Sequence, residues 1–230
     1  GDFKEFKTFD ELMNAYKKQV EYFVAALADQ EELEYKVVGE IAPYLLISML
    51  YDDCMEKNRG VFSGGVKYLG GTLETYGNIN TSDSLTAIRE LVYDKKLFTQ
   101  EQLLYMLDRN FEGFEGGRNI VMNVPKYGND NEKADIMALE VHNHICNTVR
   151  TQKNRTKLHS YLVVIINNQA NTFMGKLTGA SADGRKLGEP MANANNPSGG
   201  NDRSGITALL NSLVKLDPSV HAGAVQNMKF

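Results

Sequence analysis

Apolar residues recur at helical spacing in the first part of the chain. Thr8 and Glu11 have the spacing of a capping box, in which each side chain bonds to the other residue's backbone N–H. The helix is therefore expected to begin directly after Thr8. One apolar face follows, made of Leu12, Tyr16, Val20, Phe23, Val24 and Leu27.

The next segment, from about Pro43 to Lys57, has a near-continuous apolar run instead of a stripe. This run predicts a helix that is buried on most sides, with Pro43 in its first turn. Residues 60–81 are rich in glycine and cannot be a simple helix throughout. They lack the GxxxxGK[ST] pattern of a phosphate-binding loop, so a structural loop is favoured over a nucleotide site.

Helical periodicity returns between residues 82 and 151. Apolar stripes predict helices over residues 82–96, after Thr99 and over about residues 131–151. Thr99 and Gln102 again have capping-box spacing. The run 119–124, which Pro125 ends, is predicted to be a short strand.

Leu162 to Ile166 is an uninterrupted apolar run rich in β-branched residues. It predicts a strand buried on both faces, as in parallel sheets and barrels. Polar and small residues follow at once, where strand ends in α/β proteins meet ligands, although an ordinary solvated loop is the alternative. Residues 206–216 have helical periodicity, and residues 221–230 have an extended pattern.

Together these elements predict a predominantly helical α/β chain. Residues 1–230 form one segment, in which residues 1–155 are mostly helical and residues 156–230 follow a strand–loop–helix–strand order. Two or three strands do not complete a parallel sheet that is covered on both faces. We therefore expect other parts of a longer chain to complete the sheet, or the isolated piece to rearrange into a mostly helical domain.

Composition limits the classes of partner. The chain has 230 residues, 42% of them hydrophobic, so it can bury a core. A net charge of -4 without a Lys/Arg block argues against nucleic acid and anionic membranes as partners. No apolar run is long enough to span a membrane, and the N-terminus lacks a signal-peptide core. With only two cysteines and no disulfide framework, the chain is expected in the cytoplasm.

Few residues have the spacing of a catalytic or metal site. His142 and His144 are two positions apart on a predicted helix, so they point in different directions and cannot share an ion. Glu140 and His144 have i, i+4 spacing but no third ligand. Cys54 and Cys146 also lie on predicted helices and are interpreted as packed thiols. We predict that this chain binds no metal and no cofactor.

Several segments resemble one enzyme family, and they occur in the same order. They are IAPYLLISMLYDDCMEKNRG, TSDSLTAIRELVYDKK, VPKYGNDNEKAD, TGASADGRKLGEPMANANNPSGGNDRSGITALLNSLVKLD and the later AVQNMKF. The last two segments resemble the late part of the glycyl radical enzymes, the group that contains pyruvate formate-lyase and the radical diol and hydroxyproline dehydratases. The three upstream segments also resemble that family. Residues 206–230 resemble the dehydratase and lyase branch more than pyruvate formate-lyase.

The resemblance implies a partial segment of a ten-stranded α/β barrel. In the family a cysteine loop and a glycine loop meet at the barrel centre, shielded from water and oxygen. The cysteine loop has the pattern G-C-x-E, whereas Cys54 follows Asp53 in a predicted helix. The R-V-x-G-Y glycine loop is also absent from these 230 residues, so we expect the chain to be inert alone. The resemblance further implies that the parent enzyme carries a glycyl radical, which a radical S-adenosylmethionine activating enzyme installs.

The resemblance also implies roles for particular residues. From their place in the family pattern, three residues are expected to face the substrate pocket: Asn168, Thr172 and Phe173. The D-G-R motif is expected to brace loops through a charge-assisted hydrogen bond, and its residues are Asp183, Gly184 and Arg185.

The favoured function is removal of a leaving group from a small polyol, amino acid or amine after hydrogen abstraction. One alternative is a formate acetyltransferase that acts on pyruvate and coenzyme A. Another is a non-catalytic relic or accessory module that binds a partner chain. Apolar surface left exposed where missing strands should pack predicts self-association.

Overall fold

The computed structural model describes residues 1–167 and 169–228, and its centre is a small parallel sheet. Its three strands lie in the order β1 (Gly70–Glu74), β2 (Ser160–Ile165) and β3 (Gly223–Ala224). Gly70 pairs with Ser160, and Val164 pairs with Gly223. The predicted parallel arrangement is confirmed. Of the segment 221–230, which was predicted to be extended, only Gly223 and Ala224 pair with β2 in the described part of the chain.

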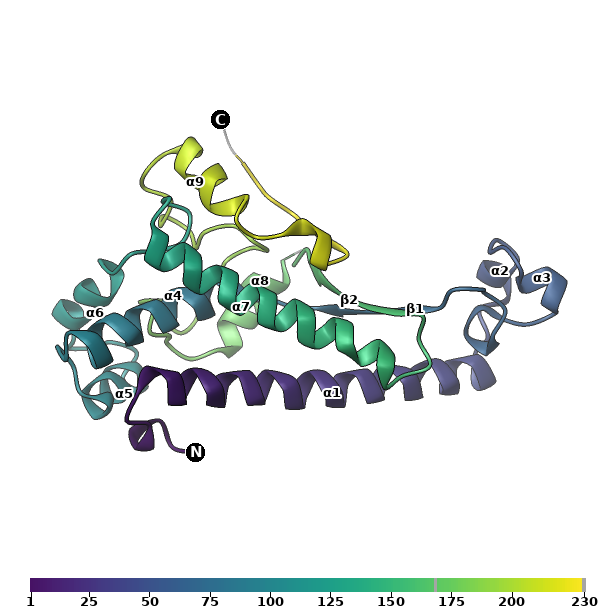
Figure 1. The fold of residues 1–230 in the computed structure, drawn as a ribbon, viewed down its shortest axis with the longest axis horizontal. Coiled ribbons are helices and arrows are strands. Elements are labelled where there is room, and N and C mark those ends of the chain that lie inside the picture. Colours follow the sequence, from purple (N-terminus) through teal and green to yellow (C-terminus); the bar gives the residue numbers. More distant parts are fainter. Residues whose placement is uncertain (168, 229–230) are drawn as a thin grey trace.

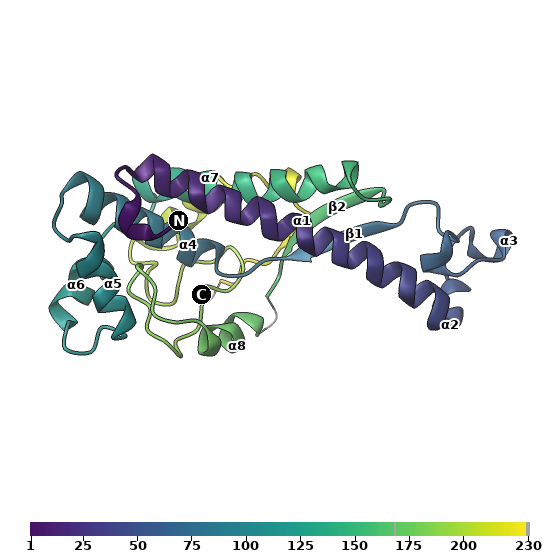
Figure 2. The same cartoon turned by 90° about the horizontal axis from the view of Figure 1, so that it is seen from below.

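Two long helices, α1 (Phe9–Ile41) and α7 (Glu132–Thr151), run side by side along the sheet (Figures 1 and 2). The predicted capping box begins α1, because Thr8 Oγ1 accepts from the N–H of Glu11 while the Glu11 carboxylate accepts from the N–H of Thr8. The main core lies between these helices and the sheet. It includes Val24, Ala28, Val141, Val149, Tyr161 and Val163.

Shorter helices form the rest of the body (Figure 1). They are α4 (Asn78–Ile88), a π-helical continuation (Arg89–Asp94), α5 (Gln100–Asp108), α6 (Glu115–Met122), α8 (Ala170–Leu177) and α9 (Ile206–Leu213). The capping box at Thr99 is confirmed at the start of α5. No helix in the described ranges has both the length and the apolar character needed to cross a membrane.

The prediction of one buried helix over residues 43–57 is wrong. The structure has two single turns, α2 (Leu45–Ser48) and α3 (Cys54–Lys57), on a projection beyond the end of α1 (Figure 1). Asp53 adopts a left-handed φ of 73°, which interrupts the helix. Leu46 is 70% exposed, because little of the described chain covers this side of the projection.

Two further predictions need correction. Residues 119–124 form no strand, because Asn119 to Met122 belong to α6 and Val121 is buried in helical packing. The glycine-rich segment 60–81 is not all loop, because it contains β1. A Cβ atom on Gly71 would overlap the ring of Tyr161, so this glycine lets β1 approach β2 closely.

The burial of β2 also differs from the prediction. Tyr161, Val163 and Ile165 are buried on one face, whereas Leu162 and Val164 on the other face are half-buried. The sheet is therefore well covered on one side only within the described part of the chain.

Candidate functional site

A buried asparagine fixes the end of β2. Asn167 has a left-handed φ of 64° and no exposed surface. Its backbone N–H donates to Glu74 Oε1 at 2.8 Å, and its Nδ2 donates to the Thr75 carbonyl at 2.8 Å. Its Oδ1 accepts from the N–H of Ala194 at 2.7 Å. Asn167 therefore joins the ends of β1 and β2 to a later loop, and its side chain is buried there.

The predicted pocket residues belong to the segment that leads into α8. Asn168 lies outside the described residues. Thr172 is exposed on α8, and Phe173 beside it is 63% exposed. Asn171, in contrast, is buried and donates from Nδ2 to the Met191 carbonyl at 3.1 Å. Thr172 and Phe173 therefore lie on the exposed face of α8. In Figure 2, helix α8 itself lies apart from α1 and α7.

Asp183 is the centre of a buried hydrogen-bond network. Its Oδ1 accepts from the hydroxyl of Ser181 and from the backbone N–H of Arg185. Its Oδ2 accepts from Asn80 Nδ2 at 2.6 Å, and Asn80 also donates to Ser198. Asp183 is 5% exposed, so these bonds connect α4 to the loops on either side of the motif.

The guanidinium of Arg185 is surrounded by backbone carbonyls. It is 6% exposed and donates to the carbonyls of Gly175 (3.2 Å), Thr178 (3.1 Å), Gly179, Lys186 (3.0 Å) and Glu189 (3.0 Å). Three of these residues lie at or just after the C-terminal end of α8. Because the last carbonyls of a helix lack partners within the helix, Arg185 supplies the missing donors.

Arg118 of α6 holds the same loop from the other side. Its Nε donates to the Gly184 carbonyl at 2.7 Å, and its Nη2 lies 3.1 and 3.2 Å from the two carboxylate oxygens of Glu189. Glu189 Oε2 also accepts from the N–H of Lys186. The loop between residues 184 and 189 is therefore fixed to α6 and α8 together.

A cavity of about 690 Å³ with a mixed polar and apolar lining lies beside this network. Its walls include Asn80, Arg118, Asn171, Asp183, Arg185 and Asn196. Thr172 and Phe173 do not line it, so the cavity and the predicted pocket residues lie on different sides of α8. No sequence pattern predicted a role for Asn80, Asn171 or Asn196. Four of residues 193–201 are asparagines, which is a local sequence signal of polar groups there.

Near the cavity, burial shifts the pKa values of two residues of opposite charge, Asp83 and Lys126. Asp83 of α4 is fully buried, and burial raises its pKa to about 7, against the lowering effect of the Lys126 ammonium. Burial likewise lowers the pKa of Lys126, whose Nζ donates to the Val121 carbonyl at 2.9 Å. Asp83 Oδ1 accepts from the N–H of Tyr127, so the pair connects α4 to the loop after α6.

The cysteines and histidines are packed against protein atoms, and Cys146 Sγ lies 3.8 Å from His142 Nε2. Cys54 and Cys146 are both buried, and burial raises the pKa of Cys146 to about 12. His142 Nε2 lies 3.4 Å from the Asp217 carbonyl, whereas His144 Nε2 lies 3.2 Å from the Lys17 carbonyl. The two histidines point apart, as predicted. Among the described residues, no three His, Cys, Asp or Glu side chains are placed to bind one metal ion.

Comparison with known proteins identifies the family. The pyruvate formate lyase-like family matches residues 1–175, which is most of the chain.

The chain belongs to the pyruvate formate lyase-like family of glycyl radical enzymes.

The similarity to individual glycyl radical enzymes extends over the whole chain. It is 34% identical to trans-4-hydroxy-L-proline dehydratase of Clostridioides difficile and 32% identical to (2S)-3-sulfopropanediol dehydratase of Klebsiella oxytoca. Each comparison covers 100% of this chain and 29% of the relative. A solved structure of the C. difficile hydroxyproline dehydratase with its substrate bound covers 97% of this chain and 28% of its own, with a TM-score of 0.91. The chain thus spans about three-tenths of these relatives.

Glycyl radical enzymes carry their radical on a glycine residue, and the described residues do not fit that group. No R-V-x-G-Y sequence occurs in the 230 residues. Cys54 is buried at the start of α3 on the projection, and Cys146 is buried inside α7. Cys54 lines a cavity of about 310 Å³ on the projection, but both thiols lie in helices and neither is in a G-C-x-E loop, so no radical step is assigned to either residue.

Proposed function

We propose that these residues form part of the barrel wall of a glycyl radical dehydratase or C–X lyase. The whole enzyme would remove a leaving group from a small polyol, amino acid or amine after radical hydrogen abstraction. The observation that carries this proposal is the 34% identity to hydroxyproline dehydratase over the full chain, together with a closely matching fold. The second dehydratase relative supports the same reaction class.

The small sheet supports placing the chain in a ten-stranded barrel. All three strands are parallel, and in the described ranges β1 and β3 each pair with β2 alone. A sheet of three short parallel strands with two free edges is unfavourable as a complete structure, because unpaired edges expose backbone donors and acceptors. Additional strands beside β1 and β3 would satisfy them.

Within this barrel we assign Asn168, Thr172 and Phe173 to the substrate side. They directly follow β2, and ligands in parallel α/β folds bind at the carboxyl ends of strands. The exposed face of α8 bears Thr172 and Phe173, which leaves both side chains free to meet a ligand. Asp183, Gly184 and Arg185 are assigned a bracing role, since their partners are protein atoms.

We further propose that these 230 residues are inert by themselves. Both thiols are buried, and the loop that would store the radical is not among these residues. The whole enzyme would receive its radical from a radical S-adenosylmethionine activating enzyme in the cytoplasm.

Anaerobic activation followed by electron paramagnetic resonance tests this proposal. The 230-residue chain should give no glycyl radical signal after treatment with an activating enzyme, whereas the whole enzyme should give one. Activated whole enzyme should then dehydrate a compound such as trans-4-hydroxy-L-proline or 1,2-propanediol. Turnover of pyruvate with coenzyme A would instead favour the formate acetyltransferase function. A glycyl radical signal from the 230-residue chain would contradict the proposal that it is inert. The absence of a signal from the whole protein would favour a non-catalytic module.

A further inference from the structure

Helix α8 is too short to be stable without contacts to the rest of the protein. It has eight residues, and its N-cap residue, Gln169, makes no side-chain capping bond. Helices of this length are marginal in water, so their stability comes from tertiary contacts. The placement of the α8 surface therefore depends on what holds the two ends of the helix.

Both ends of α8 are held by one segment, residues 184–191. At the N-terminal end, Asn171 and Met191 exchange two hydrogen bonds, from Met191 N–H to the Asn171 carbonyl at 3.2 Å and from Asn171 Nδ2 to the Met191 carbonyl at 3.1 Å. At the C-terminal end, Arg185 donates to the carbonyls of Gly175 and Thr178. A Cβ atom on Gly175 would overlap the Glu189 carbonyl, so helix and segment are in close contact.

The segment is itself anchored to the body of the molecule. Arg118 of α6 donates to the Gly184 carbonyl and to both oxygens of Glu189. Asn110 Oδ1 accepts from the N–H of Leu187 at 2.8 Å. A continuous set of hydrogen bonds therefore leads from α6 through residues 184–189 to α8.

We propose that Arg185 is a positioning residue, which sets the place of Thr172 and Phe173 by holding the C-terminal end of α8. The proposal rests on the proposed function, in which these two side chains face substrate. A cation at the C-terminal end of a helix interacts favourably with its carbonyls. A planar guanidinium reaches five carbonyls in fixed directions, which a lysine ammonium on a flexible stem does not reproduce.

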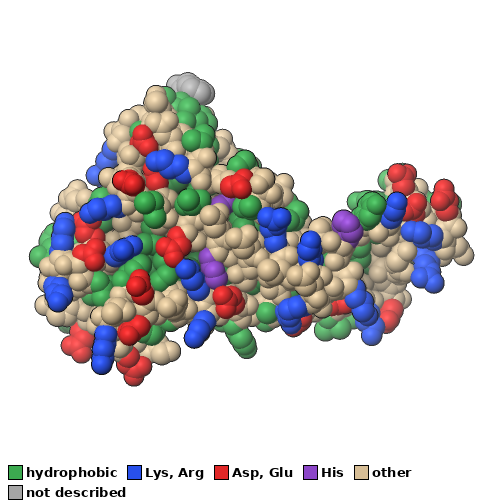
Figure 3. Space-filling model, in the orientation of Figure 1, with side chains coloured by type: hydrophobic (Ala, Val, Ile, Leu, Met, Phe, Trp, Pro, Cys, Tyr) green, Lys and Arg blue, Asp and Glu red, His purple; other side chains and the backbone are tan. Residues whose placement is uncertain are grey.

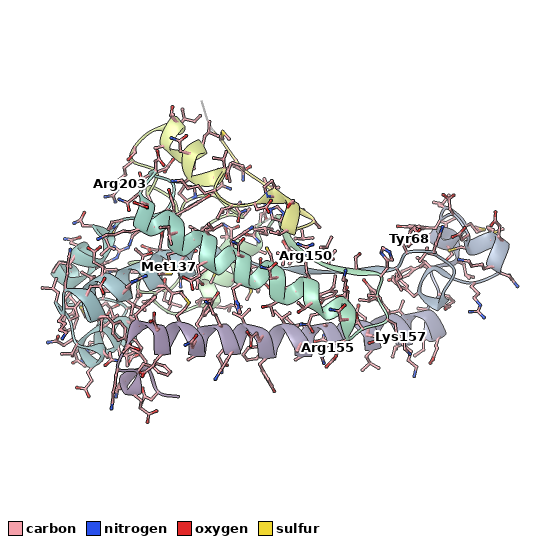
Figure 4. All side chains as sticks on the ribbon, viewed as in Figure 1. Tyr68, Met137, Arg150, Arg155, Lys157 and Arg203 are labelled. Carbon is pink, nitrogen blue, oxygen red and sulfur yellow. The ribbon has the colours of Figure 1, made fainter. Side chains whose placement is uncertain are left out.

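Hydrogen exchange of the whole enzyme tests the structural part of the proposal. In Arg185→Lys, amides of α8 should exchange roughly tenfold faster, because several charge-assisted hydrogen bonds are lost. Amides of α7 should keep their wild-type rates. The matched control is Arg155→Lys. Arg155 lies just after the C-terminal end of α7, where it pairs with Asp29 of α1 (Figure 4). This control should leave α8 unchanged.

The outcomes separate positioning from general stability. Unchanged α8 exchange in Arg185→Lys would overturn the proposal, and so would equal acceleration in α7 and α8. Arg185→Ala should accelerate α8 further; if it does not fold, Arg185→Lys alone decides.

Kinetics of the whole enzyme test the link to substrate. Arg185→Lys should raise KM and lower kcat about as Phe173→Ala does, while Arg155→Lys should change neither. If α8 loosens but Thr172→Val and Phe173→Ala leave both constants unchanged, the link to substrate is wrong. A whole enzyme that dehydrates no substrate would instead contradict the proposed function, while the exchange result would stand independently.

Discussion

At the scale of single residues, the groups with the most reactive chemistry are held in structural roles. His142 of α7 is buried, and its Nε2 lies 3.4 Å from the Asp217 carbonyl, so the neutral ring donates one hydrogen bond there. The ring of His221 packs edge-on against it, with 5.4 Å between centroids. Burial lowers the pKa of both imidazoles. The pair therefore attaches the C-terminal segment to α7 in its uncharged form.

This arrangement predicts acid sensitivity. In the unfolded chain the two imidazoles take up protons below about pH 6.5, whereas in the folded chain they stay neutral to lower pH. The unfolded state then binds more protons, so the free energy of unfolding falls as pH decreases through this range. Urea denaturation should show a larger loss between pH 7.5 and 5 for the wild type than for the double variant His142→Gln, His221→Gln.

Asp83 has an opposing effect on the pH dependence of stability, which the comparison of the wild type with the double variant removes. Because its pKa is raised to about 7 in the fold, Asp83 lowers stability as pH rises from about 4 to 7, in wild type and variant alike. His144→Gln on the same helix is the control and should keep the wild-type pH dependence. Equal losses in the wild type and the double variant would contradict the role of the pair.

At the scale of elements, the sheet depends on a glycine. Gly71 of β1 pairs with Tyr161 of β2, and any side chain at position 71 would meet the Tyr161 ring and Leu158. The close approach lets Tyr161 fill the core between the sheet and α1. The glycines of residues 60–81 therefore include one that is required by strand packing.

Gly71→Ala should destabilise the fold. The added methyl group has no free space, and overpacking of this kind costs about 1–3 kcal/mol of unfolding free energy. Gly116→Ala is the matched control, because a Cβ atom at position 116 of α6 meets nothing within 4 Å. Alanine there should raise stability by about 0.5–1 kcal/mol. Chemical denaturation of both variants measures the difference, and equal stabilities would show that β1 tolerates a side chain.

At the scale of the whole molecule, apolar surface is exposed far from the core. The projection that bears α2 and α3 stands apart from the body, and hydrophobic side chains lie on its surface (Figures 1 and 3). Leu46 is 70% exposed and Leu50 is 79% exposed. Such a patch marks an interaction site or an aggregation liability. In the proposed barrel, other parts of the enzyme would cover it.

The isolated chain should therefore self-associate through the projection. The double variant Leu46→Lys, Leu50→Lys should weaken association by roughly tenfold or more, because two apolar side chains leave the contact. Sedimentation velocity measures the change. Leu97→Lys, at a 52% exposed leucine of the body, is the control and should leave association unchanged. A wild-type chain that stays monomeric at high concentration would contradict the prediction.

The sequence alone determined the features that depend on local patterns. The long helices α1 and α7 and the two capping boxes follow from spacing within a few residues, because helix formation and capping are local interactions. The strand β2 was visible as a β-branched apolar run. The family was visible because several segments that resemble its motifs occur in the same order along the chain, which does not depend on packing.

Only the tertiary structure decided which groups are buried and what they contact. The polar side chains Asn80 and Asp83 of α4 are buried because partners more than 40 residues away satisfy them, which no local pattern encodes. Likewise β1 forms inside a glycine-rich segment because β2, about 90 residues later, pairs with it. The prediction of a buried helix from the apolar run 43–57 was wrong, because burial requires other parts of the chain to cover the helix. The described chain covers little of this segment. Long-range contacts, not local preference, set these outcomes.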